Sequence, residues 1–155
     1  MPEMENATFA AGCFWGIETA FAKLKGVLDT AVGYAGGSTG NPTYEEVSTG
    51  RTGHAESVRV SFNPSLVTYE ELLKTFFQIH DPTTSNRQGL DVGSQYRSII
   101  FYHSDSQKEK AQKFKKELRA SGRFKEDIVT EIIPASDFHK AEEYHQKYFK
   151  RRGIG

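Results

Sequence analysis

Strand-like and helix-like patterns alternate along this chain, and the alternation restricts the folds that it can adopt. Residues 7–11 and 27–34 read as strands on either side of an apolar stripe at helical spacing. Residues 55–62 alternate strictly between apolar and polar side chains, which predicts a strand with one buried face and one face in water. The helical stripe consists of Phe14, Ile17, Phe21 and Leu24.

The second half of the chain continues the alternation. Two of its helices open with capping boxes, in which a Ser or Thr is followed three residues later by Glu or Gln. The expected elements are a helix from Thr68, a strand over 98–102, a lysine-rich helix from Ser104, a strand over 128–133 and a last helix that Asp137 caps. The apolar face of this last helix would carry Phe138, Ala141, His145, Tyr148 and Phe149. About five strands and four helices result.

Interleaved strands and helices without a dinucleotide-binding fingerprint predict an α+β fold, a two-layer sandwich with a mixed sheet. A chain of 155 residues fits one domain, 1–155, with short flexible termini over about 1–6 and 151–155. Between 35 and 53 we expect a glycine-rich loop followed by an irregular passage. Long loops in compact domains are often functional.

Composition restricts the function classes. Lys plus Arg and Asp plus Glu number 20 each, so net charge predicts neither a nucleic-acid nor a membrane partner. The single cysteine allows neither an internal disulfide nor a cysteine-based zinc site, and no metal or cofactor is indicated. Without a secretory signal or an apolar stretch of membrane-spanning length, we expect a cytoplasmic protein.

Cys13 follows the first strand and precedes the first helix. A thiol at a helix N-terminus is close to unpaired backbone N–H groups and to the positive end of the helix dipole, so we expect a lowered pKa and a nucleophilic thiolate. The alternative is that Cys13 is a small buried apolar residue.

Glu56 shares its strand face with Val58, Val60 and Phe62, so the pattern points its carboxyl group inward. Apolar surroundings raise the pKa of a carboxyl group, which would allow Glu56 to act as a general acid at neutral pH. The alternative is a structural glutamate, paired with one of three arginines, Arg51, Arg59 or Arg97.

Three aromatic residues lie outside the apparent core. Trp15 is off the stripe of the first helix, which favours a place in a pocket, whereas the neighbouring Phe14 fits the stripe. Tyr44 and Tyr96 follow turn residues and are either loop anchors or hydrogen-bond donors to a polar ligand oxygen.

The motif Gly12-Cys13-Phe14-Trp15-Gly16 resembles the signature of the class A peptide methionine sulfoxide reductases, which reduce the S epimer of methionine sulfoxide. The similarity runs from about Ala7 to Phe149, and it implies a ferredoxin-like core. Further blocks that resemble the family are Gly33-Tyr34-Ala35-Gly36-Gly37, Pro42-Thr43-Tyr44, Gly53-His54-Ala55-Glu56, His80-Asp81-Pro82-Thr83, residues 91–98 and Glu142-Glu143-Tyr144-His145-Gln146.

The resemblance assigns a role to each candidate residue. It implies that Cys13 is the nucleophile and that Phe14 and Trp15 enclose the S-methyl group of the substrate. It further implies that the sulfoxide oxygen is bound by the hydroxyl and carboxyl groups of Tyr44, Glu56 and Tyr96, while Asp91 supports the pocket. Oxide leaves sulfur only after it is protonated, which agrees with Glu56 as the acid, and Cys13 would become a sulfenic acid.

Many members of that family carry a second, resolving cysteine near the C-terminus, and this sequence has none. We therefore expect an external thiol from thioredoxin, glutaredoxin or glutathione to recycle the Cys13 sulfenic acid. Two other functions stay open. One is a thiol peroxidase or redox-sensing cysteine protein, and the other is a noncatalytic module that binds oxidised methionine.

Overall fold

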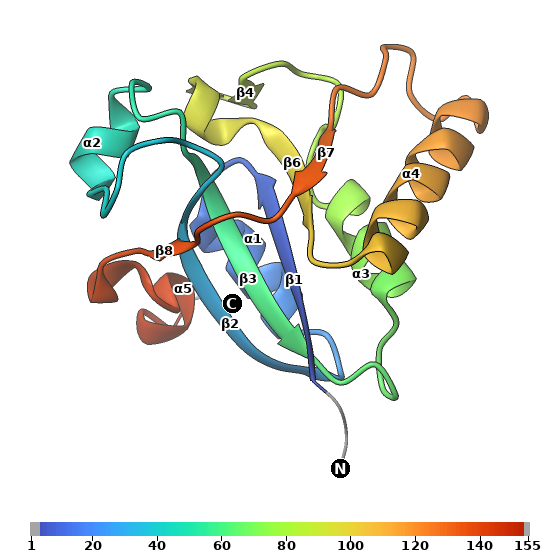
Figure 1. Cartoon of the computed structure of the whole chain (residues 1–155), viewed down its shortest axis with the longest axis horizontal. Coiled ribbons are helices and arrows are strands. Elements are labelled where there is room, and N and C mark those ends of the chain that lie inside the picture. Colours follow the sequence, from blue (N-terminus) through green and yellow to red (C-terminus); the bar gives the residue numbers. More distant parts are fainter. Residues whose placement is uncertain (1–3, 154–155) are drawn as a thin grey trace.

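The structure, a computed structural model, describes residues 4–153 and is built around a six-stranded sheet with β1 near its middle (Figure 1). Spatially the strands follow the order β7-β6-β1-β3-β2-β8, and every neighbouring pair is antiparallel except β6 and β7, which are parallel. The strands are β1 (Glu5–Ala11), β2 (Val27–Ala35), β3 (Ala55–Phe62), β6 (Ser98–Tyr102), β7 (Glu131–Pro134) and β8 (His139–Lys140).

Helices and short elements fill the connections between these strands. The longer helices are α1 (Phe14–Ala22), α3 (Tyr69–Gln78) and α4 (Asp105–Ala120). The shorter elements are α2 (Tyr44–Ser48), the hairpin of β4 (Arg87–Gln88) and β5 (Asp91–Val92), the 3₁₀ turns η1 (Ser94–Tyr96) and η2 (Glu143–His145), and α5 (Tyr148–Arg151). None of the helices within residues 4–153 is long and apolar enough to cross a membrane.

The four central strands have the ferredoxin-like arrangement. In chain order the elements run β1-α1-β2-β3-α3-β6, and β3 lies between β1 and β2 in the sheet, so the unit is a split βαβ motif. The parallel strand β7 beyond β6 makes the sheet mixed. The prediction of an α+β fold with a mixed sheet is therefore confirmed.

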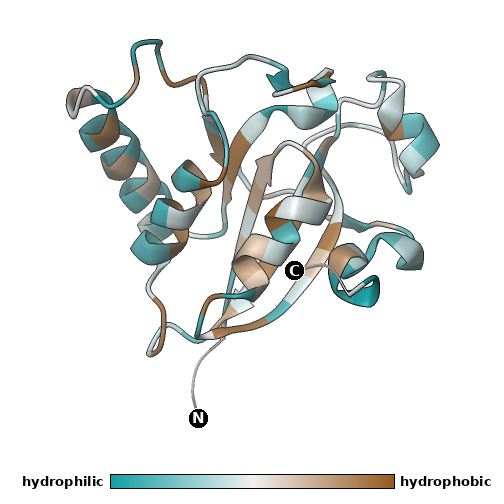
Figure 2. Ribbon diagram, turned by 180° about the vertical axis from the view of Figure 1, so that it is seen from behind, coloured by the Kyte–Doolittle hydropathy of each residue, from teal (hydrophilic) through white to brown (hydrophobic). Residues whose placement is uncertain are grey.

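The main hydrophobic core lies between the sheet and helices α1 and α3. Phe9 of β1 stacks on Phe21 of α1 at 5.0 Å between ring centroids and on Phe76 of α3 at 5.1 Å. Seen from behind, α1 crosses this face of the apolar central strands, whereas α4 is largely hydrophilic (Figure 2). The solvated lysine-rich helix expected from the sequence is α4.

The opposite face of the sheet is covered as well, contrary to the single wet face expected for β3. The chain between β7 and β8 crosses this face (Figure 1). In this connection lies Phe138, and the guanidinium of Arg59 lies over its ring, 4.8 Å from the ring centroid. Gly33 of β2 makes room, because a Cβ there would come within 2.5 Å of the Phe138 ring. Ser57 is fully buried under this cover.

The expected last helix from Asp137 to Phe149 is wrong. Residues 139–140 form β8 instead, and the backbone N–H of Ala141 donates to the carbonyl of Val32 at 2.9 Å. The edge of β2 thus supplies hydrogen bonds that a helix would have supplied internally, and tertiary contact overrides the helical period. Only Tyr148–Arg151 is α-helical here.

Other differences concern element boundaries. The passage before Gly53 contains the short helix α2, with Thr43 and Glu46 forming a capping box. The strand expected over 128–133 begins only at Glu131. Of the termini expected to be flexible, residues 1–3 and 154–155 lie outside the described residues, whereas β1 already begins at Glu5 and α5 extends to Arg151.

Candidate active site

Cys13 is the N-cap residue of α1, which places its side chain at the start of the helix. The turn into the helix depends on Gly12, whose φ of 95° lies in the left-handed region that favours glycine. A Cβ on Gly12 would come within 2.9 Å of the Gln88 side chain, so the glycine also allows the β4–β5 hairpin to pack beside Cys13. The thiol is free and partly buried.

The expected lowering of the Cys13 pKa is wrong for this structure. Hydrogen bonds from the backbone N–H groups of Trp15 and Gly16 do lower it, as a helix N-terminus should. Burial outweighs them, and the negative charges of Glu56 and Asp91 add to its effect, so the pKa of the thiol rises to about 11. At neutral pH the free protein therefore carries Cys13 as a thiol.

Glu56 is buried, as its strand parity predicted, with only 2% of its surface exposed. Its Oε1 accepts a hydrogen bond from the backbone N–H of Phe14 at 3.2 Å, which ties the carboxyl group to the first turn of α1. Burial raises the pKa of Glu56 to about 7, helped by the charge of Asp91 and opposed by the Phe14 hydrogen bond. A substantial fraction of Glu56 is therefore protonated at neutral pH.

The alternative in which an arginine pairs with Glu56 does not fit the contacts of these arginines. Arg97 donates to the carbonyl oxygens of Gly53 and Ser94 and pairs with Glu131, with Nε and Oε2 3.4 Å apart. Arg59 lies over the Phe138 ring on the opposite face of the sheet. Within residues 4–153, the ion pairs do not include Glu56.

Tyr44, Asp91 and Tyr96 come from three separate segments and share the electrostatic surroundings of Cys13 and Glu56. Tyr44 is the first residue of α2, Asp91 begins β5 and Tyr96 ends η1. Burial raises the pKa of Tyr96 to about 12, and charges on Glu56, Tyr44, Asp91 and Cys13 contribute. The pKa of Tyr44 is likewise raised by burial and by Glu56. Both phenols are therefore neutral hydrogen-bond donors.

Phe14 and Trp15 differ in burial and in their contacts. Phe14 is buried, with its ring centroid 5.8 Å from that of Tyr34. Trp15 is partly buried, and one face of its indole stacks on Tyr148 at 3.7 Å, with the two rings within 7° of parallel. Its Nε1–H donates a hydrogen bond to Nδ1 of His145 at 3.0 Å. Trp15 thus packs against the C-terminal segment, next to the nucleophile.

The glycine-rich loop before α2 is held in place by His54, which is 2% exposed. Its Nδ1 accepts from the backbone N–H of Gly37 at 3.0 Å, and its Nε2 lies 2.7 Å from the carbonyl oxygen of Thr39. Gly37 is required here, because a Cβ would meet the His54 backbone nitrogen at 2.3 Å. This loop leads directly into α2 and so helps to place Tyr44.

Sequence reasoning assigned no role to Glu142 or His145, which both contact the site. Glu142 accepts from the hydroxyl of Tyr34 at 2.9 Å and from the backbone N–H of Tyr44 at 3.0 Å. His145 is 1% exposed and contacts Trp15 as described above. The signal was their position in the block at 142–146, which resembles the family, but His145 was interpreted only as part of the apolar face of the last helix.

The site thus combines a thiol, a carboxyl group that is partly protonated at neutral pH, and two phenols. Phe14 and Trp15, here called the aromatic wall, lie directly after the thiol in the chain. Such a set can attack an electrophilic atom with sulfur while it donates a proton and hydrogen bonds to a neighbouring oxygen. Among residues 4–153, no cluster of three or more His, Cys, Asp or Glu side chains could hold a metal ion.

Comparison with known proteins places this arrangement in a family. The sequence model of the family described as "Peptide methionine sulfoxide reductase" matches residues 5–154. The chain is 62% identical over 151 residues to the "Peptide methionine sulfoxide reductase MsrA" of Methanosarcina mazei, a match that covers 97% of this chain and 72% of that protein.

Solved structures agree. The structure is similar to that of Mxr1 from Saccharomyces cerevisiae in reduced form, with a TM-score of 0.91 and 41% identity, over 99% of this chain and 88% of the other. It also resembles Mxr1 in complex with Trx2, with a TM-score of 0.66 and 32% identity, over 94% and 85% of the two chains. On sequence and structure alike, the chain belongs to the peptide methionine sulfoxide reductase family of oxidoreductases.

Proposed function

We propose that this protein reduces methionine-S-sulfoxide, free or in proteins, to methionine, with Cys13 as the nucleophile and Glu56 as the general acid. The observation that carries the proposal is the connection between them. Cys13 caps α1, and the buried Glu56, with a pKa near 7, is hydrogen-bonded to the backbone of the next residue, Phe14. A thiol and a proton donor are thus held at the start of the same helix.

The proposed reaction is balanced without a cofactor. The Cys13 sulfur attacks the sulfoxide sulfur and forms an S–S bond, and the S–O bond of the substrate breaks, so that the protonated oxygen is released as hydroxide. The hydroxide then bonds to the Cys13 sulfur while the S–S bond breaks. Methionine leaves, two electrons have passed from the Cys13 sulfur to the substrate sulfur, and Cys13 remains as a sulfenic acid. The oxygen must gain a proton before it can leave sulfur. Glu56 supplies this proton, and its carboxylate then takes the proton of the Cys13 thiol.

Because the pKa of Cys13 is raised, we infer that the bound substrate helps to ionise the Cys13 thiol. With a pKa of about 11, only about one thiol in 10⁴ is ionised at pH 7. A sulfoxide whose oxygen receives the Glu56 proton acquires positive charge on sulfur. A positive charge beside Cys13, together with the Trp15 and Gly16 backbone N–H groups, favours the thiolate.

The remaining candidates fit the rest of the substrate. Phe14 and Trp15 offer apolar ring surface for the S-methyl group. The neutral hydroxyl groups of Tyr44 and Tyr96 are suited to donate to the sulfoxide oxygen. Asp91 does not need to touch the substrate: burial is the main cause of the raised pKa of Glu56, and the charge of Asp91 adds to it.

We further propose that a small dithiol protein of the thioredoxin class recycles Cys13, with glutaredoxin and glutathione as alternatives. The sequence holds a single cysteine, so an external sulfur would attack the sulfenic acid and form a mixed disulfide that a second thiol resolves. The solved complex of Mxr1 with Trx2 supports a partner of this kind. A thioredoxin without its resolving cysteine should form a trapped disulfide through Cys13, and failure to trap any thiol partner would count against the proposal.

The structure disfavours the alternative of a thiol peroxidase or redox sensor. Peroxide reacts with the thiolate, and such proteins depend on a lowered cysteine pKa, whereas burial raises that of Cys13. A noncatalytic module for oxidised methionine would need the aromatic wall but not the acid. Sub-stoichiometric protein that produces excess methionine would exclude this module.

The experiment that tests the proposed function uses the purified protein with dithiothreitol and the separated epimers of a methionine sulfoxide peptide. We expect multiple turnovers with the S epimer, little reaction with the R epimer, and slow oxidation of Cys13 by hydrogen peroxide. Rapid reaction with peroxide and none with either sulfoxide would refute the assignment.

A further inference from the structure

The segment Glu142–Tyr148, here called the C-terminal clamp, contacts two residues of the candidate active site, Tyr44 and Trp15. Glu142 accepts from the backbone N–H of Tyr44 at 3.0 Å, and Tyr148 stacks on Trp15 at 3.7 Å. Between them His145 accepts from the Trp15 indole at 3.0 Å. The clamp thus fixes one residue proposed to bind the sulfoxide oxygen and one proposed to enclose the methyl group.

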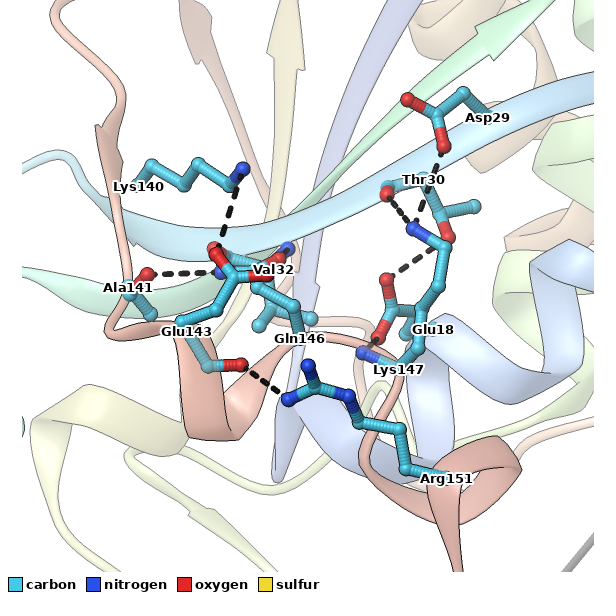
Figure 3. A network of polar contacts seen from close by, with 10 residues as sticks. All are labelled: Glu18, Asp29, Thr30, Val32, Lys140, Ala141, Glu143, Gln146, Lys147 and Arg151. Atoms are coloured by element: carbon cyan, nitrogen blue, oxygen red, sulfur yellow. Dashed lines mark hydrogen bonds and ion pairs between the residues drawn. The ribbon is translucent and has the colours of Figure 1, made fainter. Parts of the chain in front are cut away.

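Buried polar contacts hold the clamp firmly to the sheet and to α1 (Figure 3). The Gln146 amide bonds to both backbone groups of Val32 at 2.9 Å, which is how a neighbouring strand would pair with β2. The backbone N–H of Lys147 donates to Oε1 of Glu18 at 2.7 Å, and the other oxygen of Glu18 accepts from Thr30 at 2.8 Å. Glu18 is itself only 2% exposed. The two residues that follow His145 are therefore fixed, and Glu142 before it is held by its hydrogen bonds with Tyr34 and Tyr44.

The hydrogen bond between Trp15 and His145 defines the state of the imidazole. Indole N–H groups only donate, so Nδ1 of His145 must be the unprotonated acceptor and Nε2 carries the hydrogen. Nε2 is buried and has no hydrogen-bond partner within the described residues. An unsatisfied buried donor is unfavourable, so packing alone would favour an apolar ring at this position. The one polar contact that a phenylalanine could not make is the one with Trp15.

Stacking alone does not fix the indole. Tyr148 covers one face of Trp15 and would allow the ring to slide or rotate within its plane, whereas the bond to His145 fixes the direction of Nε1–H. The ring centroids of Phe14 and Tyr44 lie 5.2 and 4.5 Å from that of the imidazole, so His145 also packs against these two residues of the site.

We propose that His145 is a positioning residue that orients the Trp15 indole and thereby sets the fit of the site to an S-methyl group. This inference rests on the proposed function. It assigns His145 no contact with the reacting atoms. Its effect should therefore be on substrate binding and on the discrimination between alkyl groups, rather than on proton transfer.

The test compares two substitutions at His145 with a matched control. His145→Phe keeps an aromatic ring but removes the acceptor, whereas His145→Asn places an amide oxygen near the position of Nδ1. The control is His103→Phe. It also replaces a histidine that makes a side-chain hydrogen bond, in this case to Thr8, and it lies directly after the last residue of β6. The substrates are N-acetylmethionine sulfoxide and its S-ethyl analogue, both with dithiothreitol as reductant.

We expect His145→Phe to raise the KM for the S-methyl substrate about tenfold. A tenfold change corresponds to the free energy of about one hydrogen bond, here the one that orients the indole. Its kcat should change little, and its preference for S-methyl over S-ethyl should fall. Partial recovery of both in His145→Asn, and wild-type values in His103→Phe, would support the inference. A fall in kcat at unchanged KM, or an unchanged preference in a folded His145→Phe protein, would overturn it.

A second readout does not depend on turnover. Trp15 is the only tryptophan, so the protein has a single indole N–H resonance, and in the wild type this N–H should show a scalar coupling through the hydrogen bond to Nδ1 of His145. Absence of this coupling in the folded wild type overturns the inference even if no His145 variant folds. Failure of the proposed function would appear differently, as a wild-type protein that reduces neither substrate.

Discussion

Replacing Glu56 with glutamine should separate the chemical role of this residue from its effect on stability. Glutamine has nearly the same shape, and its amide oxygen can still accept the 3.2 Å hydrogen bond from the Phe14 N–H. It cannot ionise. Burial raises the pKa of Glu56 from 4.5 to about 7. At about 1.4 kcal/mol per pKa unit, ionising Glu56 costs about 3 kcal/mol more in the folded protein than in the unfolded chain.

The direction of the stability effect follows from where the proton binds. Below pH 4.5 both the folded and the unfolded chain keep Glu56 protonated. As the pH rises towards 7, the unfolded chain loses the proton and the folded chain retains it, so the free energy of unfolding falls. His80 has the opposite effect, because burial lowers its pKa to about 4, so the free energy of unfolding rises as the pH increases from about 4 to its ordinary value of 6.5.

Because Glu56 and His80 oppose each other, the pH profile of the wild type alone is uninformative. The informative quantity is the difference in unfolding free energy between Glu56→Gln and the wild type, in which the contribution of His80 cancels. We expect this difference to grow in favour of the variant by up to about 3 kcal/mol between pH 4.5 and pH 8. Urea unfolding at a series of pH values measures it. The same substitution should lower kcat/KM about 10²–10⁴-fold below pH 7, and by less above pH 7, where the wild type loses the Glu56 proton as well.

Two outcomes would refute this reasoning. A difference in unfolding free energy that does not change with pH would show that Glu56 ionises in the folded protein as readily as in the unfolded chain. A near-normal rate in Glu56→Gln would show that the residue is structural. Asp91→Asn is the matched control, because removing the Asp91 charge should lower the pKa of Glu56 while it leaves the carboxyl group in place.

Three further predictions concern neighbouring groups. Cys13→Ser should abolish reduction while sulfoxide binding, measured by calorimetry, stays close to wild type, because a hydroxyl is a poor nucleophile; measurable turnover would contradict the role of Cys13. Alkylation of Cys13 by iodoacetamide in the free protein should accelerate up to at least about pH 9, since burial raises its pKa, and a plateau near neutral pH would contradict this. Glu142→Gln should raise KM several-fold by weakening the hold on Tyr44, and an unchanged KM would show that this contact does not place Tyr44.

The sequence predicted the parts of the fold that depend on local pattern. The strict alternation over 55–62 matches β3 at both ends, and the Thr68 and Ser104 caps mark the starts of α3 and α4. The last helix failed because the edge of β2 offered backbone partners, which no local period can reveal. The capping box Thr43-x-x-Glu46 at α2 was present in the sequence, but it was overlooked because residues 35–53 were interpreted as a loop.

The candidate site shows the same division. Strand parity was enough to predict a buried Glu56. The pocket expected for Trp15 from its off-stripe position stays a prediction, and the structure shows its contacts with Tyr148 and His145. The pKa of Cys13 was predicted in the wrong direction, because a helix terminus is visible in the sequence and the depth of burial is not. His145 was missed since its role depends on a partner 130 residues away in the chain.

The central claim is that Cys13 takes the oxygen of a methionine sulfoxide. Mass spectrometry of the protein after a single turnover without reductant tests it directly. The account predicts one equivalent of methionine and one added oxygen, located on Cys13 and absent from Cys13→Ser. Methionine released without oxidation of Cys13, or an oxidised Cys13 without methionine, would contradict it.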